Sequence, residues 1–267
     1  MTPTVAIGGL GAIGFAVAEA LDRGIAGLRL VAVSGRDRDR ARARMAHFRD
    51  PPAVVDLAGL AAADIVVEAV PAAAFEAIAL PAIAAGRTLI ACSAGALLPR
   101  LHLVDAARQS GARIVVPTGA LLGLDAVRAA AEGPVERVSM ETRKPPAGLA
   151  GAPFLEARGL DMARVTVPTC VFRGNAREAA AGFPANVNVA AALALAGIGP
   201  ERTEVEIWAD PTVTRNTHTI RVEAEAARFT MTIEGVPSAE NPRTGRLTPL
   251  SVLACLRGLS ATLKVGS

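Results

Sequence analysis

Three glycines near the start of the chain limit its fold more than any other feature. Residues 4–10, TVAIGGL, have the apolar pattern of a short β-strand, and the segment FAVAEALDRG that follows the glycines has the pattern of a helix. Between them Gly9, Gly11 and Gly14 show G-x-G-x-x-G spacing. In this context the first glycine permits a tight turn, the second lets a pyrophosphate approach the backbone, and the third lets the helix pack on the strand. The free N–H groups at the start of the helix bind phosphates, so the segment predicts a dinucleotide site.

Strand and helix patterns alternate through the first 120 residues. Further strands are expected in the segments 28–33, 64–70, 88–97 and 112–121, with helices at 72–86 and 101–111. Alternation with short connections predicts a parallel sheet that carries helices on both faces. We therefore predict a dinucleotide-binding domain of the Rossmann type over residues 1–120, with its ligand at the carboxyl ends of the strands.

The residues after the second strand bear on which dinucleotide is bound. NAD sites carry an acidic residue there for the ribose 2′-hydroxyl, whereas an arginine accommodates the 2′-phosphate of NADP. The chain reads VAVSGRD, so Ser34 stands where the carboxylate is expected and Arg36 follows, although Asp37 is close enough to reach a ribose. Alternatively, residues 36–44 form only the solvated face of a helix. We expect NADP to be favoured over NAD, and the cofactor-binding residues to include Gly9, Gly11, Ala12, Ile13, Gly14, Ser34 and Arg36.

The second half has a different pattern. From Arg137 onwards, β-rich runs with partial period-two alternation are interrupted by two expected helices, at 175–183 and 185–197. The segment 247–263 is expected to be helical, with Thr248 as its N-cap and Pro249 in its first turn. We predict an α+β domain with a mostly antiparallel sheet over residues 121–245, and a C-terminal helix within 246–267 that packs back on the first domain.

Composition argues against several classes of protein. No apolar run approaches the roughly 20 residues of a membrane-spanning helix, and the N-terminus lacks a basic segment followed by an apolar one. The cysteines, Cys92, Cys170 and Cys255, are widely spaced and form no metal-binding pattern, so we expect a cytoplasmic protein without a metal site. With 3% aromatic residues and no tyrosine, the chain has few groups on which nucleic-acid bases could stack.

Seven segments, in order along nearly the whole chain, carry a resemblance to a known family. They are GGLGAIG, CSAGAL, TGALLGLDAV, TRKP, VFRGNAREAAAGFPANVNVAAALALAGIG, ADPTVTRNTH and ENPRTGRLTPLSV. On these segments the chain resembles the L-aspartate dehydrogenases. The resemblance implies NAD(P)-dependent oxidative deamination of L-aspartate to iminoaspartate, which hydrolyses to oxaloacetate and ammonia, and also the reverse reductive amination. It further implies a homodimer formed through the sheet of the second domain, and a role in NAD biosynthesis.

The resemblance implies a catalytic histidine at His218 and cofactor contacts at Ala120 and Asn188. His218 also suits the chemistry, because the substrate ammonium must lose protons and water must attack the imine, and histidine can hold or release a proton near neutral pH. The alternative is a loop histidine bonded to the backbone. His47 lies in an arginine-rich segment and His102 opens a helix, so neither competes for this role.

Several polar residues are candidates for binding the substrate. Aspartate brings two carboxylates, which need cationic or N–H donors, and Lys144, Arg143 and Arg215 could supply them. Lys144 is one of two lysines in a chain that otherwise uses arginine. Asn186 could bind a ligand or serve as an N-cap. Inside an apolar helix, the amide of Asn188 would need a partner, and a nicotinamide carboxamide or a ribose hydroxyl would serve.

Resemblance to a family does not fix the substrate of each member. Two other functions therefore remain open on the sequence. One is a related amino-acid dehydrogenase or imine reductase with a different substrate. The other is a non-catalytic sensor that binds NADP and regulates a partner.

Overall fold

The computed structural model describes residues 2–184, 187–238 and 245–266. The chain divides into two compact units. The first comprises Met1–Pro117 and Thr248–Val265, and the second comprises Thr118–Leu247 together with the last two residues. The change of unit at 117–118 lies close to the expected boundary after residue 120.

Within the described residues, the first unit contains a six-stranded sheet in the order β3-β2-β1-β4-β5-β6. Every pair of neighbouring strands in it is parallel. The strands are β1 (Thr4–Gly8), β2 (Arg29–Ser34), β3 (Ala53–Val54), β4 (Ile65–Glu68), β5 (Thr88–Ala91) and β6 (Arg113–Val115). This order confirms the predicted doubly wound sheet, and the chain reverses its direction of winding between β1 and β4.

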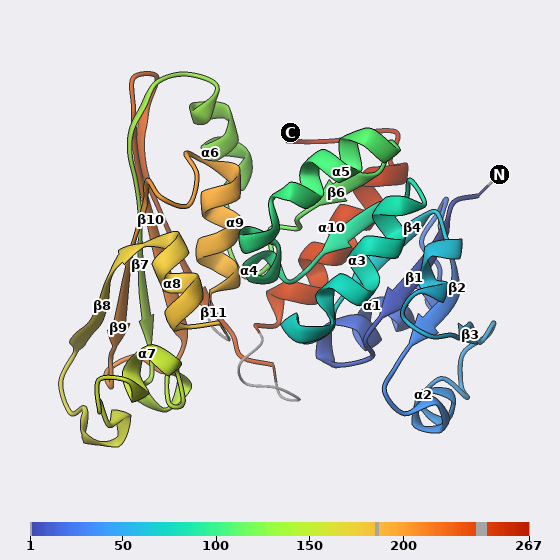
Figure 1. Ribbon diagram of the computed structural model, residues 1–267, viewed down its shortest axis with the longest axis horizontal. Coiled ribbons are helices and arrows are strands. Elements are labelled where there is room, and N and C mark those ends of the chain that lie inside the picture. Colours follow the sequence, from blue (N-terminus) through green and yellow to red (C-terminus); the bar gives the residue numbers. More distant parts are fainter. Residues whose placement is uncertain (1, 185–186, 239–244, 267) are drawn as a thin grey trace. The chain divides into compact units, whose positions relative to one another are not determined.

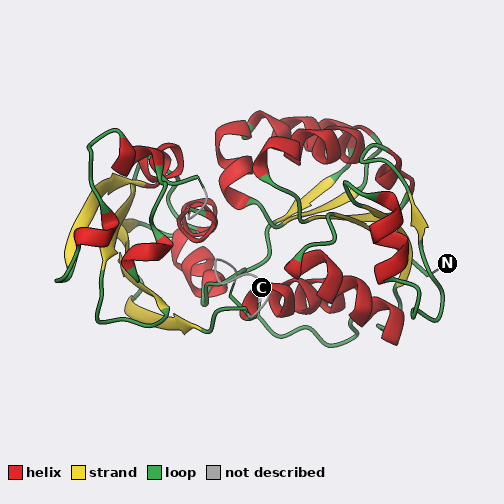
Figure 2. Ribbon diagram, turned by 90° about the horizontal axis from the view of Figure 1, so that it is seen from below, coloured by secondary structure: helices red, strands yellow, loops and turns green. Residues whose placement is uncertain are grey.

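Helices cover both faces of this sheet (Figure 2). They are α1 (Ala12–Arg23), α2 (Arg38–Arg44), α3 (Phe75–Ala84), α4 (Ala94–Leu97), α5 (His102–Ser110) and α10 (Leu247–Ser260), with 3-10 turns η1 (Gly59–Ala62), η2 (Ala72–Ala74) and η3 (Leu98–Arg100). The C-terminal helix α10 shares a core with α1 and the strands through Val252 and Leu256, both fully buried. Because α10 is already helical at Leu247, Thr248 lies inside the helix, and the prediction that Thr248 is its N-cap was wrong.

Within the described residues, the second unit contains a five-stranded sheet in the order β11-β10-β7-β9-β8 (Figure 1). The strands are β7 (Val135–Lys144), β8 (Thr169–Asn175), β9 (Thr203–Ala209), β10 (Asn216–Ala224) and β11 (Arg228–Gly235). Only β7 and β9 pair in parallel, so the prediction of a mostly antiparallel sheet is confirmed for the strands that the structure describes.

The helices of the second unit are α6 (Leu124–Ala131), α7 (Pro153–Glu156), α8 (Ala176–Gly182) and α9 (Asn188–Ala196), with 3-10 turns η4 (Pro146–Gly148) and η5 (Met162–Arg164). Side chains of β7 alternate between the faces of the sheet, as strand geometry requires. Val138 and Met140 on one face are buried in a core with residues of α8 and α9. Arg137 and Glu141 point to the other face and form ion pairs there.

Helix α8 begins with a capping box. The Asn175 side chain accepts a hydrogen bond of 2.9 Å from the Glu178 N–H, and the Glu178 carboxylate accepts one of 2.9 Å from the Asn175 N–H. These two bonds satisfy donors at the helix start that would otherwise lack partners. They fix the end of β8 to the start of α8.

We expect Asn175→Ala to lower the free energy of unfolding by about 1 kcal/mol, because the Glu178 N–H loses its acceptor. Asn175→Asp keeps an acceptor in place and should stay within about 0.5 kcal/mol of the wild type. Urea unfolding of the three proteins measures both differences. Equal losses in the two variants would contradict a capping role.

Candidate active site

The loop between β1 and α1 has the geometry expected of its glycines. Gly9 has a φ of +91°, a conformation that favours glycine, and its N–H donates a hydrogen bond of 2.8 Å to the carbonyl of Ser34. A Cβ added to Gly14 would overlap the carbonyl oxygen of Gly9. The conformation and packing of the chain itself therefore require glycine at these two positions.

Gly11 is different, because no contact with the described residues requires a glycine there. An added Cβ would meet no atom within 4 Å, and its φ of −76° suits any residue. Gly11 stands at the N-cap of α1 without a side-chain cap, immediately before Ala12 and Ile13. An open position beside unpaired helix N–H groups fits a pyrophosphate that approaches the backbone. The loop therefore suits the dinucleotide predicted from its spacing.

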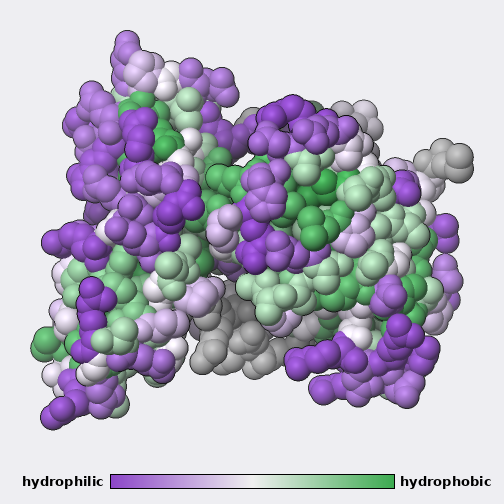
Figure 3. Space-filling view, viewed as in Figure 1, coloured by the Kyte–Doolittle hydropathy of each residue, from purple (hydrophilic) through white to green (hydrophobic). Residues whose placement is uncertain are grey.

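The end of β2 lies next to this loop. Ser34 is buried, and its carbonyl is the one bonded to Gly9, whereas Arg36 is exposed. Asp37 caps α2, since its Oδ1 accepts hydrogen bonds from the N–H groups of Asp39 and Arg40. Figure 3 shows the hydrophilic surface that gathers over α2. Asp37 thus accepts hydrogen bonds within the chain, and Arg36 is the first of the exposed residues that follow β2.

One residue of the first unit was not predicted from the sequence. Glu68, at the end of β4, is fully buried and accepts hydrogen bonds from Val70 and Ser93. The available signal was a lone acidic side chain in the apolar run DIVVEAV. Buried carboxylates are rare unless they are paired or hydrogen-bonded.

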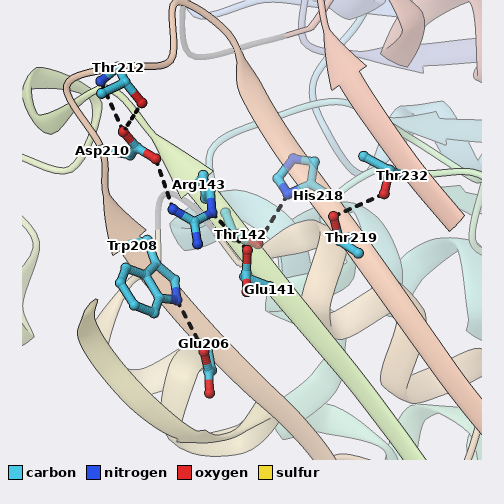
Figure 4. A network of polar contacts seen from close by, with 10 residues as sticks. All are labelled: Glu141, Thr142, Arg143, Glu206, Trp208, Asp210, Thr212, His218, Thr219 and Thr232. Carbon is cyan, nitrogen blue, oxygen red and sulfur yellow. Dashed lines mark hydrogen bonds and ion pairs between the residues drawn. The ribbon is translucent and has the colours of Figure 1, made fainter. Parts of the chain in front are cut away.

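In the second unit, Thr142, Lys144 and His218 gather on the core-facing side of the sheet. His218 of β10 lies opposite Thr142 of β7, and its Nδ1 shares a hydrogen bond of 3.1 Å with the Thr142 hydroxyl (Figure 4). Lys144 follows Thr142 by two positions on β7, so it points to the same face. The exposed fractions of Thr142, Lys144 and His218 are only 3%, 6% and 3%.

Burial changes the acid–base properties of both basic groups. Burial lowers the pKa of Lys144 to about 8. Burial and, secondly, the nearby charge of Lys144 lower the pKa of His218 to about 3. His218 is therefore a neutral imidazole at physiological pH, held by a hydrogen bond with Thr142.

A small cavity borders the side chains of Thr142 and Lys144. It has a volume of about 10 Å³, which is room for roughly one water molecule. Thr142 and Lys144 are its polar lining residues, and the others, including Val187 and Ala190, are apolar. The surroundings of Lys144 therefore have low polarity, which strengthens electrostatic interactions with any charged group that enters.

The arginine candidates behave differently from Lys144. Arg143 points to the opposite face, where it pairs with Glu141 at 2.7 Å and Asp210 at 2.9 Å and lies over the ring of Trp208 (Figure 4). Its charge is thus neutralised by two carboxylates. Arg215 is exposed in the turn before β10.

The remaining candidates lie as follows. Ala120 is half-buried in the turn that follows residue 118, and Asn188 is exposed at the first position of α9. Asn188 belongs to α9, as expected, but it is the first residue of the helix and is exposed, whereas the sequence suggested a buried position inside it. Asn186 lies outside the described residues. His47 and His102 are both exposed, so among the three histidines, all of which the structure describes, only His218 is buried.

No group of three His, Cys, Asp or Glu side chains among the described residues could hold a metal ion. No helix there has the length and apolar character needed to cross a membrane.

The roles of Gly11 and Gly14 can be distinguished by experiment. We expect Gly11→Ala to change the free energy of unfolding by less than about 0.5 kcal/mol, because the new Cβ meets nothing, while NADH affinity falls about tenfold or more. Gly14→Ala should destabilise the fold by about 1–3 kcal/mol, because its Cβ displaces the Gly9 carbonyl. Urea unfolding and NADH fluorescence titration measure these effects. Unchanged NADH affinity in Gly11→Ala would contradict a pyrophosphate site at this loop.

Comparison with known proteins agrees with both halves of the chain. The family model described as "Aspartate dehydrogenase, C-terminal" matches residues 125–259, and the one described as "Homoserine dehydrogenase, NAD binding domain" matches residues 9–117. An L-aspartate dehydrogenase of Bradyrhizobium diazoefficiens is 54% identical over 264 residues, covering 98% of this chain and 94% of the relative. L-aspartate dehydrogenase 3 of Bordetella bronchiseptica is also 54% identical, covering 98% and 97%.

A solved structure extends the similarity to the whole fold. The crystal structure of aspartate dehydrogenase from Thermotoga maritima has a TM-score of 0.74 and 28% sequence identity, with 100% of both chains covered. With this fold, the glycine loop and the sequence relatives, the chain belongs to the L-aspartate dehydrogenase family.

Proposed function

We propose that the chain catalyses the NAD(P)-dependent oxidative deamination of L-aspartate to iminoaspartate, and the reverse reductive amination. The observation that carries the proposal is the buried group of Thr142, Lys144 and His218 on one face of the second sheet. In the forward direction L-aspartate, NAD(P)⁺ and water give oxaloacetate, ammonium, NAD(P)H and a proton. The bound dinucleotide supplies the hydride acceptor for this reaction.

The glycine loop and the end of β2 are the proposed cofactor site. Backbone N–H groups at Gly11, Ala12 and Ile13 hold the pyrophosphate, in keeping with the open position at Gly11. Ala120 and Asn188 are further cofactor contacts implied by the family. Asn188, exposed at the start of α9, can offer both its amide and a helix N-terminus to a ligand.

Lys144 and His218 have complementary roles in this proposal. Lys144 carries a buried ammonium that binds a substrate carboxylate, and such a bond is strong where water is excluded. The same carboxylate offsets the charge of Lys144 that disfavours protonation of His218, so the pKa of His218 rises when aspartate binds. His218 then accepts a proton from the substrate ammonium and releases it as the proton that the overall reaction produces. The neutral imidazole can then activate the water that attacks the imine.

The burial of these groups has a consequence for substrate entry. Lys144 and His218 expose only 6% and 3% of their surfaces, and the adjoining cavity of about 10 Å³ is too small for an amino acid. We infer that groups covering the two side chains move when aspartate enters. Closure afterwards keeps water away from the reacting atoms, apart from the water that hydrolyses the imine.

NADP is the proposed cofactor in preference to NAD. Arg36 is exposed next to the expected position of the adenosine ribose, and Asp37 already caps α2. A guanidinium suits a 2′-phosphate, whereas the carboxylate of Asp37 accepts the two hydrogen bonds that cap α2.

A homodimer is the proposed assembly, formed through the outer face of the second sheet. That face carries the half-buried Trp208, whose indole N–H donates to Glu206, and the ion pair between Arg173 and Glu206. Aromatic and arginine side chains are enriched in protein interfaces. A cytoplasmic location is also proposed, since the three cysteines are free.

His218→Asn should lower kcat for aspartate-dependent NADP reduction by about 10²–10⁴-fold, because asparagine cannot accept the proton. The Kd for NADPH, measured by fluorescence titration, should stay within about twofold of the wild type. Thr142→Val, which removes only the hydroxyl that holds the imidazole, should cost less. Retained turnover in His218→Asn would contradict the proposed role, and normal NADPH binding without turnover in the wild type would favour a sensor.

The burial of Lys144 predicts a stability difference with a defined dependence on pH. The pKa of Lys144 is about 8 in the folded protein and 10.5 in the unfolded chain, so the unfolded chain binds the proton first as pH falls. The free energy of unfolding is therefore highest above pH 10.5 and decreases as pH falls through 8. Lys144→Met removes this dependence and should be more stable at pH 7, by at most about 3 kcal/mol, while its kcat/KM for aspartate collapses. Lys144→Arg is the matched control that retains a charge. Unfolding at pH 7 to 10 measures the difference, and parallel curves for the wild type and Lys144→Met would contradict it.

Arg36→Ala should raise the KM for NADP⁺ about tenfold or more and alter that for NAD⁺ less than about threefold, because only NADP⁺ carries the 2′-phosphate. Arg38→Ala, an exposed position on α2, is the matched control and should leave both values nearly unchanged. Steady-state kinetics with each cofactor measure the four constants. Equal effects of the two substitutions would mean that Arg36 belongs only to a solvated helix face.

A further inference from the structure

The buried carboxylate of Glu68 connects two loops at the carboxyl edge of the first sheet. Its Oε1 accepts hydrogen bonds of 3.0 Å from the Val70 N–H and 2.9 Å from the Ser93 hydroxyl, and its Oε2 accepts one of 3.0 Å from the Ser93 N–H. Val70 follows β4 and Ser93 follows β5. The Ser93 hydroxyl also lies 3.3 Å from the Val70 carbonyl, so one acidic side chain and one serine join the two loops.

Glu68 also adjoins the glycine loop. It pairs with Gly8 in the register of β1 and β4, and the next residue, Ala69, donates a hydrogen bond of 2.9 Å to the Gly8 carbonyl. A Cβ on Gly9 would overlap the carbonyl oxygen of Ala69. The position of β4's end and that of the phosphate-binding turn are therefore fixed against each other.

This position is the point at which the order of the strands reverses. In doubly wound sheets a dinucleotide crosses this point, with one mononucleotide on each side. The adenosine half lies on the side of β1 and β2, where the glycine loop and Arg36 are found. The nicotinamide half lies on the side of β4 and β5, above the two loops that Glu68 joins.

Burial of a carboxylate at this position lowers the free energy of unfolding relative to an apolar residue. Glu68 has no exposed surface, and its strand neighbours Val66 and Val67 are equally buried. Burial raises the pKa of Glu68, and only the hydrogen bonds from Ser93, Val70 and Cys92 oppose this effect. Stability alone would favour valine here, so the carboxylate calls for another explanation.

We propose that Glu68 is a positioning residue for the nicotinamide half of the dinucleotide. By holding the loops at Val70 and Ser93 together, Glu68 shapes the surface on which the nicotinamide ribose rests. The proposal rests on the dinucleotide binding set out under the proposed function, and it assigns a residue outside the glycine loop to one half of the cofactor.

The test separates the two halves of the cofactor by binding. Glu68→Gln has nearly the same shape, but an NH₂ group replaces one of the two accepting oxygens, so at least one of the three hydrogen bonds from Val70 and Ser93 is lost. Calorimetric titration with NADH and with ADP, which lacks the nicotinamide riboside, gives Kd values for the wild type and the variant. We expect the Kd for NADH to rise about tenfold or more and that for ADP to stay within about twofold. Gly11→Ala, which acts on the shared pyrophosphate, should weaken both ligands.

Failure of the positioning role of Glu68 and failure of the proposed reaction would give different results. Equal weakening of NADH and ADP in Glu68→Gln, or no change in either, would overturn the positioning role. A wild-type protein that binds NADH but does not oxidise aspartate would contradict the proposed reaction, and the binding comparison for Glu68 would still be decisive. Ser93→Ala gives a second route if Glu68→Gln does not fold. This substitution removes one of the three hydrogen bonds to Glu68. It should raise the Kd for NADH by a smaller factor and leave the Kd for ADP unchanged.

Discussion

The burial of two basic side chains on one face of a sheet is the constraint on which the proposed chemistry depends. Lys144 and His218 are held in an environment that disfavours charge on either of them, and the charge of Lys144 further disfavours protonation of His218. A substrate that carries carboxylates stabilises the charge of Lys144 and also favours protonation of His218, whereas a neutral ligand does neither. The site is thus poorly matched to water and well matched to an anion, which is the property required of a pocket for aspartate.

The two units contribute by different physical means. The first unit offers backbone groups, since its glycine loop and the N-terminus of α1 suit a dinucleotide without a side chain at Gly11. The second unit offers side chains placed by the alternation of β7 and by the pairing of β7 with β10. Because backbone groups of the first unit suit the cofactor, the side chains on the strands of the second unit can determine which substrate is bound.

Much of this arrangement could be predicted from local sequence. The spacing of the glycines depends on neighbouring residues, and Lys144 is conspicuous in a chain that otherwise uses arginine. What escaped prediction depends on contacts between distant segments. The hydrogen bond between Thr142 and His218 depends on the register of β7 and β10. The neutralisation of Arg143 depends on Asp210, the residue that follows β9. The start of α9 at Asn188 was missed because an alanine-rich segment carries little signal for its own boundary.

In the proposed reaction, hydride passes from Cα of aspartate to the nicotinamide ring. The most direct measurement uses L-aspartate deuterated at Cα, followed by mass spectrometry of the reduced dinucleotide after turnover. We expect the deuterium to appear on the nicotinamide ring, and to be absent from it when NADP⁺ is incubated with the protein alone. Reduced dinucleotide without deuterium, or no reduction by a protein that binds the cofactor, would contradict the proposed reaction.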